Sequence, residues 1–265
     1  MMTNLLRRIA AALVATMAVC LPASATTFST DYTDLWWNPS EDGWGINFIQ
    51  QGEVIFATMF VYGADNTNRW YVASNLTGSS QSSFSGPLYQ TNGPYFAAAW
   101  NQAQRTTTQV GTMTVNFSGD SGTLSYTVNG TTVNKSIVRM TWRNNSMQGN
   151  YLGGITANSS GCSGGQNTPI LIFNTMTISG SSSVSIAINF FTNGGTSAQC
   201  NFNGSYAQAG QMGNVNGNWN CSTGNTGTFS LSQLQVGING ITGKFSGRDQ
   251  FCTYNGNFGG VRDVI

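Results

Sequence analysis

The residues best suited to binding chemistry are concentrated in one short segment, residues 35–47. This segment combines three indoles, two carboxyl groups, two amides, one proline and two glycines. An indole can stack on the apolar face of a sugar or another flat ring, while carboxylates and amides bind hydroxyl groups. The segment therefore predicts a ligand platform formed by Trp36, Trp37, Asn38, Glu41, Asp42, Trp44 and Asn47.

The same segment also has a structural interpretation, which we favour for most of it. Indoles bury large apolar areas, Gly43 and Gly45 allow another part of the chain to approach closely, and Pro39 fixes a turn. Neighbouring side chains of an extended strand point to opposite faces, so Trp36 and Trp37 cannot both enter one core. We therefore expect at least one of these two indoles to be exposed.

Catalysis would need groups that this chain largely lacks. There is no histidine, which excludes Ser-His-Asp and Cys-His mechanisms and histidine-ligated metal sites. A glycoside hydrolase needs two carboxyl groups that face one cleft, and the only pair worth testing combines Glu41 or Asp42 with Glu53. Glu53 itself fits a Gly52-Glu53 hairpin turn better than a catalytic role. With no histidine and few carboxyl groups, we expect no catalytic residue, no cofactor and no metal site.

The charge pattern argues against a nucleic-acid partner. The chain has 10 Lys and Arg residues and 9 Asp and Glu residues, and charged residues make up only 7% of it. Typical globular proteins have about 25%. Such a chain has no basic stripe for phosphates. Lys135, Arg139 and Arg143 are expected on one strand, with their side chains in solvent.

Residues 1–25 have the pattern of an export signal. Arg7 and Arg8 precede an apolar run, and residues 23–25 form a small-x-small cleavage sequence. The run is shorter than the roughly 20 residues needed to span a bilayer. A lipid anchor at Cys20 is disfavoured because Val19 stands directly before it, where a small residue is expected. We expect export to the periplasm, surface or exterior of a Gram-negative bacterium, with no transmembrane segment in the mature chain.

The four remaining cysteines all lie in the second half of the chain. In an oxidising compartment an even set predicts two disulfides, and the absence of any Cys-x-x-Cys spacing argues against a metal site. The preferred pairs are Cys200 with Cys221 and Cys162 with Cys252. The alternative pairs Cys162 with Cys200 and Cys221 with Cys252.

The cysteines also divide the mature chain into two expected domains. Residues 26–146 contain six tryptophans and no cysteine, whereas residues 147–265 contain all four cysteines and one tryptophan. The boundary falls at a polar run, residues 143–146.

Strand and turn signals predict β-structure in both domains. In the first domain, residues 54–62 resemble a strand that is buried on both faces. Residues 96–104 could form a short helix, and Asn129-Gly130 is typical of a two-residue hairpin turn. That turn places Tyr126 opposite Val133.

In the second domain, the pattern Cys-x-aromatic-x-Gly-x-aromatic occurs twice, starting at Cys200 and at Cys252. Folding residues 200–208 back on residues 213–221 pairs Phe202 with Trp219 and Cys200 with Cys221. We therefore predict an all-β protein of antiparallel meanders closed into small barrels or sandwiches, the second half stapled by disulfides. An outer-membrane barrel is disfavoured, because the strands alternate aromatics with Asn, Ser and Gly.

Trp36, Pro39, Gly43 and Gly45 form a Trp-x-x-Pro-x-x-x-Gly-x-Gly motif that carries a family resemblance. With it, residues 34–142 resemble a group of secreted proteobacterial proteins of uncharacterised function. Further landmarks of that group correspond to residues 60–62, 70–71, 86–89, 93–96 and 111–114. Two departures stand out: Trp44 occupies a position where many relatives have His, and residues 66–68 replace a glycine turn. The resemblance implies export and a β-fold, and it implies no mechanism.

Together these features predict an exported, non-catalytic β-protein that binds a glycan or another component of the cell envelope. The alternatives are a carbohydrate-active hydrolase that uses Glu41, Asp42 or Glu53, and a purely structural protein of the surface or matrix.

Overall fold

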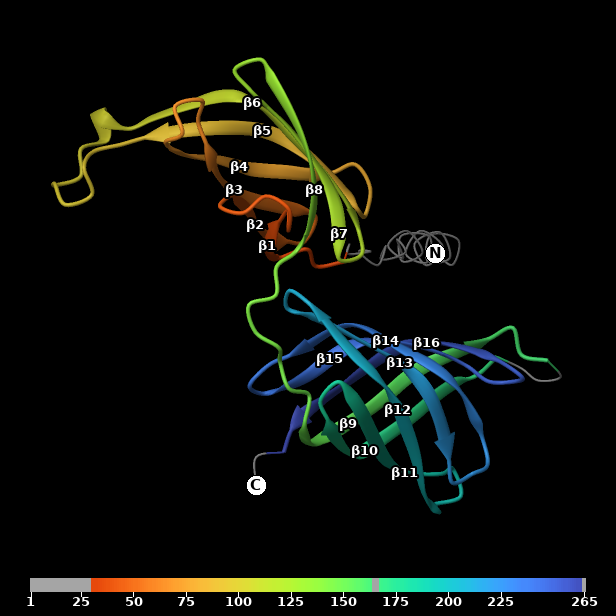
Figure 1. The fold of residues 1–265 in the computed structure, drawn as a ribbon. Coiled ribbons are helices and arrows are strands. Elements are labelled where there is room, and N and C mark those ends of the chain that lie inside the picture. The colour runs from red at the N-terminus through yellow and green to blue at the C-terminus, as the bar shows by residue number, and fades with distance from the viewer. Residues whose placement is uncertain (1–29, 164–166, 264–265) are drawn as a thin grey trace, which may run out of the picture.

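The computed structural model describes residues 30–163 and 167–263, and β-strands dominate them. Within these residues the strands close into two antiparallel barrels that follow each other along the chain (Figure 1). The prediction of an all-β fold of antiparallel meanders in two halves is confirmed, and both halves are barrels. The expected export signal, residues 1–25, lies outside the described residues.

Each barrel is an up-and-down meander of eight strands. The first contains β1 (Asp34–Trp37), β2 (Gly45–Gln51), β3 (Val54–Tyr62), β4 (Asn68–Gly78), β5 (Ser83–Asn92), β6 (Thr106–Ser118), β7 (Ser121–Val128) and β8 (Thr131–Arg139). The second contains β9 (Gly149–Ser160), β10 (Pro169–Gly180), β11 (Ser183–Phe191), β12 (Ser197–Ala209), β13 (Met212–Cys221), β14 (Thr226–Val236), β15 (Gly240–Arg248) and β16 (Thr253–Arg262). Closure comes from pairing of β8 with β1 and of β16 with β9, so neither barrel has a free edge.

The link between the barrels is residues 140–148, from the end of β8 to the start of β9. Met147, near its end, already packs in the core of the second barrel. The expected domain boundary between residues 146 and 147 falls within this link.

The strands of the first barrel alternate between an apolar interior and an outer face. In β3, Ile55, Ala57 and Met59 are completely buried, whereas Phe56 and Phe60 are 40% exposed. The expectation that this strand is buried on both faces was therefore wrong. A closed barrel has a single interior, and a strand covered on both sides would need a second layer. The outer side of β3 consequently carries exposed aromatic rings.

Short hairpins agree with their sequence signals. Asn129 and Gly130 connect β7 to β8 with positive φ values of 49° and 86°, and Tyr126 lies opposite Val133, as predicted. Between β12 and β13, the predicted pairs Phe202–Trp219 and Cys200–Cys221 are also found.

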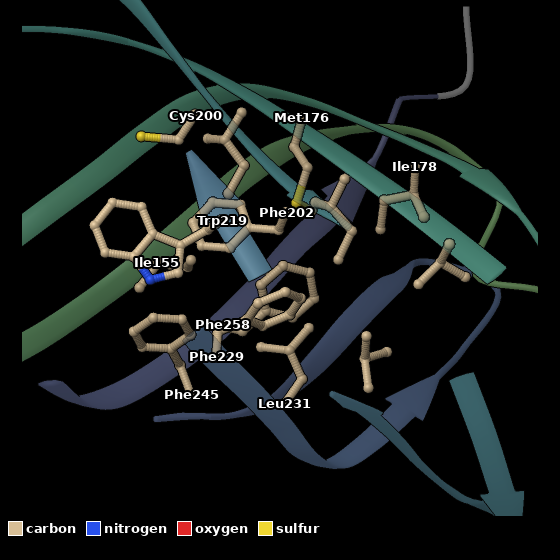
Figure 2. Close-up of a cluster of buried hydrophobic side chains, with 14 of the residues drawn as sticks. Ile155, Met176, Ile178, Cys200, Phe202, Trp219, Phe229, Leu231, Phe245 and Phe258 are labelled. Atoms are coloured by element: carbon tan, nitrogen blue, oxygen red, sulfur yellow. The ribbon is translucent and has the colours of Figure 1, made fainter. Parts of the chain in front are cut away.

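Both preferred disulfides are present, Cys162–Cys252 and Cys200–Cys221. The second is buried at the edge of an aromatic core, where the Phe202 and Phe229 rings meet edge to face with centroids 5.2 Å apart (Figure 2). The prediction of a disulfide-stapled second half is confirmed.

The expected helix at residues 96–104 was wrong, because only η2 (Gln102–Gln104), a single 3-10 turn, forms there. Its N-cap is Asn101, whose side chain accepts a hydrogen bond from the backbone N–H of Ala103. Trp100 and Phe96 are exposed, so no apolar stripe holds a longer helix against the barrel. Among the residues that the structure describes, no helix is long and apolar enough to cross a membrane.

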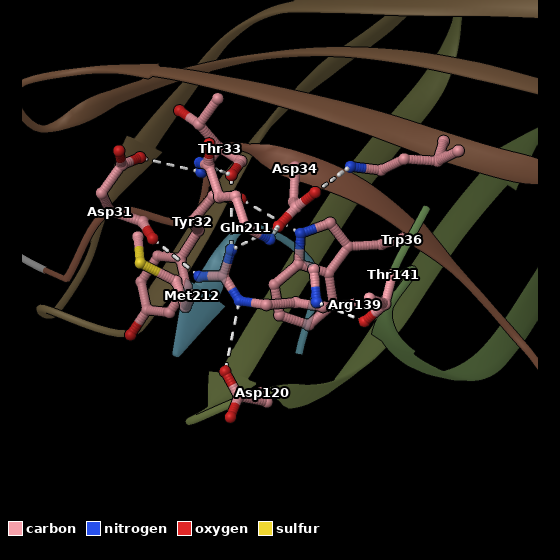
Figure 3. Close-up of polar contacts among 12 residues, drawn as sticks. Asp31, Tyr32, Thr33, Asp34, Trp36, Asp120, Arg139, Thr141, Gln211 and Met212 are labelled. Atoms are coloured by element: carbon pink, nitrogen blue, oxygen red, sulfur yellow. Dashed lines mark hydrogen bonds and ion pairs between the residues drawn. The ribbon is translucent and has the colours of Figure 1, made fainter. Parts of the chain in front are cut away.

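Polar contacts join the barrels where the β12–β13 hairpin reaches the first barrel (Figure 1 and Figure 3). At its tip, the backbone N–H of Gln211 donates to Asp34 Oδ2 at 2.8 Å, and that of Gly210 donates to Thr141 Oγ1 at 2.8 Å. Asp34 is in turn held by Arg139, whose side chain is only 1% exposed.

The solvent-facing positions expected for Lys135 and Arg139 are therefore corrected, as is the placement of Arg143 on their strand. Arg139 is buried, Lys135 is half-buried and paired with Glu41, and Arg143 is exposed but lies beyond the end of β8. The acidic partners of Lys135 and Arg139 come from distant parts of the chain, which a pattern within one strand cannot show.

Candidate functional site

The turn between β1 and β2 is shaped by aromatic rings that lie over its two glycines. A Cβ atom added to Gly45 would lie 2.8 Å from Cζ of Phe60, and one added to Gly43 would meet the Tyr62 hydroxyl. Gly43 also has a φ of 93°, which favours glycine. The Gly-x-Gly spacing thus gives room to two rings from β3, and these rings fix the turn against the outer face.

Trp36 belongs to the core of the first barrel and is not part of a ligand platform. Its side chain is completely buried, its Nε1 donates to the carbonyl of Tyr32 at 3.0 Å, and the Arg139 guanidinium lies 4.9 Å from its ring centroid. We therefore correct the expectation for this residue. The alternation argument holds, because the adjacent Trp37 points outward and is half-buried.

Trp44 is held over the turn by an ion pair between Glu41 and Lys135. Its Nε1 donates to Glu41 Oε2 at 3.0 Å, and the Lys135 ammonium group lies 5.5 Å from its ring centroid. Lys135 also pairs with Glu41, and its hydrogen bond holds the pKa of that carboxyl below the ordinary value. Glu41 is consequently ionised near neutral pH, and it accepts hydrogen bonds from Trp44 and Lys135.

Beside this turn, the outer face of the first barrel carries a hollow of about 240 Å³. Most of its wall is aromatic or aliphatic, and Asp42 supplies its carboxyl group; the lining residues are Leu35, Trp37, Asp42, Gly43, Trp44, Gly45, Phe60, Met140 and Trp142. Trp142 is 77% exposed, and Asp42 is exposed as well. The hollow thus offers accessible indole surface and a carboxylate beside it.

The two asparagines of the predicted platform do not line this hollow. Asn38 organises the turn, because its Oδ1 accepts from the backbone N–H of Ser40 at 2.9 Å and its Nδ2 donates to Glu41. Asn47 is exposed on β2, opposite Leu35. The structure therefore brings together Trp37, Asp42 and one side of Trp44. It leaves four predicted residues outside the hollow: Trp36, Asn38, Glu41 and Asn47.

Three residues of the hollow, Phe60, Met140 and Trp142, lie outside residues 35–47 and were not predicted as site residues. Phe60 comes from β3, and Met140 and Trp142 come from the link between the barrels. Phe60 was indicated only as part of a strand and a landmark of the family resemblance, and nothing in the sequence connected Met140 or Trp142 with residues 35–47.

The carboxyl pair required by the hydrolase alternative is not assembled. Glu53 lies in the β2–β3 hairpin turn, before the first residue of β3, whereas the turn that holds Glu41 and Asp42 meets Tyr62, the last residue of β3. A strand of nine residues separates them by roughly 25 Å. The lowered pKa of Glu41 is also the reverse of what a general acid needs. In the described part of the chain, no group of three or more His, Cys, Asp and Glu side chains could hold a metal ion.

Comparisons of the chain with protein-family models, with curated proteins and with solved structures find no match. The geometry of the hollow is therefore the basis for a functional assignment.

Proposed function

We propose that this protein is exported and binds a sugar ring in the hollow of its first barrel, without catalysing a reaction on it. The observation that carries the proposal is the position of two accessible indoles, Trp37 and Trp142, beside the exposed carboxyl group of Asp42. The apolar face of a sugar ring can stack on an indole while its hydroxyl groups donate to a carboxylate.

The size of the hollow favours one ring of a larger glycan. Pockets that enclose a whole drug-sized ligand measure about 300 to 1,000 Å³. At about 240 Å³, this hollow is smaller and is open to solvent through Trp142. A glycan or another envelope component with a protruding sugar ring fits these limits.

Export is supported by the signal pattern of residues 1–25 and by two disulfides, which persist in oxidising compartments. We place the protein in the periplasm or outside a Gram-negative cell. We also assign it to the group of secreted proteobacterial proteins that its Trp-rich motif resembles.

Calorimetric titration of the mature chain, residues 26–265, with soluble peptidoglycan fragments, lipopolysaccharide and a glycan panel tests the proposal. Trp142→Ala should weaken binding of the best ligand at least about tenfold, or about 1.4 kcal/mol, without changing the melting temperature. Asp42→Asn should weaken binding as well, because it removes the charged acceptor.

The matched control is Trp100→Ala, which removes an indole that is 67% exposed and lies outside the hollow. This variant should bind normally. Equal losses for Trp100→Ala and Trp142→Ala would reject a specific site, and no binding by the unaltered protein would favour the structural alternative.

A further inference from the structure

The hairpin formed by β5 and β6 extends beyond its neighbours in the first barrel (Figure 1). The paired residues of β5 and β4 end at Tyr89, and the β7–β8 turn ends beside Val110, whose carbonyl accepts from the N–H of Asn129. Past these points, β5 and β6 continue to pair with each other as far as Asn92 and Thr106. The hairpin is therefore an arm that carries its turn away from the barrel wall.

Residues 93–105 connect the two strands of this arm, and we call them the arm tip. Tyr95, Phe96 and Trp100 are 66%, 92% and 67% exposed, and alanines fill positions 97–99 between them. Every residue of the arm tip except Pro94 is exposed. Six consecutive aromatic or aliphatic residues thus face solvent at the end of a projecting hairpin.

The shape of the arm tip is set by contacts within it. The backbone N–H of Ala98 donates to the carbonyl of Tyr95 at 3.0 Å, and that of Gln104 donates to the carbonyl of Asn101 at 3.1 Å. The ring centroids of Tyr95 and Phe96 lie 4.6 Å apart. The aromatic rings therefore project from a turn that is already formed, which lowers the ordering cost of any contact they make.

Charge is almost absent from this part of the chain. Between Arg69 and Asp120 the only charged residue is Arg105, at the base of the arm tip. The apolar residues can therefore leave water without carrying an ion with them. An arginine directly behind them can lay its aliphatic stem along apolar surface and donate to phosphate oxygens.

This arrangement matches the chemistry of a bilayer surface. Tyrosine and tryptophan are enriched where the hydrocarbon of a membrane meets water, and interfacial segments bury their apolar side shallowly among headgroups and acyl chains. A lipid surface also needs no cleft complementary to a projecting tip.

A second copy of the chain is a poorer partner for the arm tip. A stable protein interface takes roughly 20 to 30 residues from each side. The arm tip, residues 93–105, is much smaller than that. Contact between two such tips would consequently be too small to hold a dimer together.

We propose that the arm tip inserts into the interface of a phospholipid bilayer and so attaches the first barrel to a membrane surface. Tyr95, Phe96 and Trp100 enter the boundary between headgroups and acyl chains, and Arg105 contacts headgroup phosphates. The attachment is weak and reversible, because few side chains are buried. It is separate from the hollow beside Trp142 and does not depend on the sugar-binding proposal.

Sedimentation of the mature protein with phosphatidylcholine vesicles measures the attachment. Phe96→Asp should lower the partition coefficient at least about tenfold, because it removes the most exposed ring and introduces a charge. Phe191→Asp is the matched control on the second barrel, where the ring is 64% exposed, and it should bind like the unaltered protein. Melting temperatures confirm folding of both variants.

Trp100 reports insertion directly. On vesicle binding, the tryptophan emission should shift to the blue and be quenched by lipids with brominated acyl chains, because the Trp100 indole leaves water. Trp100→Phe should still sediment with vesicles yet lose most of both signals. Trp142→Phe should keep the binding and both signals.

Three outcomes overturn the proposal. The first is that the unaltered protein does not bind the vesicles. The second is that Phe96→Asp and Phe191→Asp bind equally well. The third is that quenching by brominated lipids disappears in Trp142→Phe and persists in Trp100→Phe, which would place a different side of the first barrel against the bilayer.

Discussion

At the scale of single residues, Arg139 has the most buried charge in the part of the chain that the structure describes. Its guanidinium contacts Asp34 at 3.1 Å and Asp120 at 3.4 Å, and it donates to the carbonyl of Asp31 at 2.6 Å. The Nε atom is close enough to Asp120 for an ion pair but forms no hydrogen bond with it. In a chain with 7% charged residues, this cluster is a costly arrangement unless all its members are present.

Replacement of Arg139 by methionine should therefore destabilise the protein. The aliphatic stem is approximately retained, but Asp34, whose side chain is 11% exposed, loses its main cation. Removal of one partner from a buried pair typically costs about 3 to 5 kcal/mol. Urea unfolding followed by circular dichroism measures this change, with Arg143→Met as a control at an exposed arginine. Equal stability of the two variants would show that the buried contacts add nothing.

At the scale of elements, the hairpins were predictable because their determinants are local. Asn129 and Gly130 tolerate the positive φ values of their turn, and the period of two then fixes the pairs on both sides. The same reasoning predicted the Cys200–Cys221 pair, which is bonded in the structure. Local signals of this kind set strand register throughout short hairpins.

Features that depend on distant contacts were not predictable in the same way. Barrel closure pairs Trp36 with Arg139, and no local pattern near either residue indicates the other. The hollow has the same origin in part, because Phe60 reaches Gly45 through the β2–β3 hairpin, whereas Trp142 meets Trp37 only after β8 has paired with β1. The sequence therefore predicted that one of Trp36 and Trp37 points outward, but it could not predict which other residues line the hollow.

A bulge in β6 provides a prediction at this scale. Leu88 pairs with Gly111 and Tyr89 with Gln109, so Val110 is an extra residue, and its carbonyl accepts from the N–H of Asn129 at 2.8 Å. The bulge brings Gly111 against the neighbouring strand. A Cβ atom there would lie 1.9 Å from the carbonyl oxygen of Thr127, a contact that the backbone must relieve by moving.

Gly111→Ala should accordingly lower the free energy of unfolding by about 1 to 3 kcal/mol, the usual range for an overpacked site. The matched control is Gly194→Ala in the β11–β12 turn, where the nearest atom to a new Cβ lies 3.9 Å away and φ is outside the left-handed region. That variant should be neutral or slightly stabilised. Urea midpoints of the two variants distinguish the outcomes, and a stable Gly111→Ala protein would contradict the close approach.

At the scale of the whole molecule, the two barrels are stabilised differently. The first relies on its apolar core and on the ion pairs of Arg139, and residues 26–146 contain no cysteine. The second has a core of its own and two disulfides that span 21 and 90 residues. Crosslinks that close loops of these lengths contribute about 3 to 5 kcal/mol each in the chain-entropy account.

Reduction should therefore destabilise the second barrel more than the first. Six of the seven tryptophans lie in residues 26–146, so tryptophan emission reports mainly on the first barrel, whereas far-ultraviolet circular dichroism reports on both. Addition of a reductant should split the thermal unfolding transition followed by circular dichroism into two. The midpoint of the transition followed by tryptophan emission should hardly change. A chain with serine at all four mature cysteines should not respond to reductant. If reduction shifts the emission transition as far as the dichroism transition, the contacts of Gln211 and Thr141 couple the barrels into one unfolding unit, and independent stabilisation is rejected.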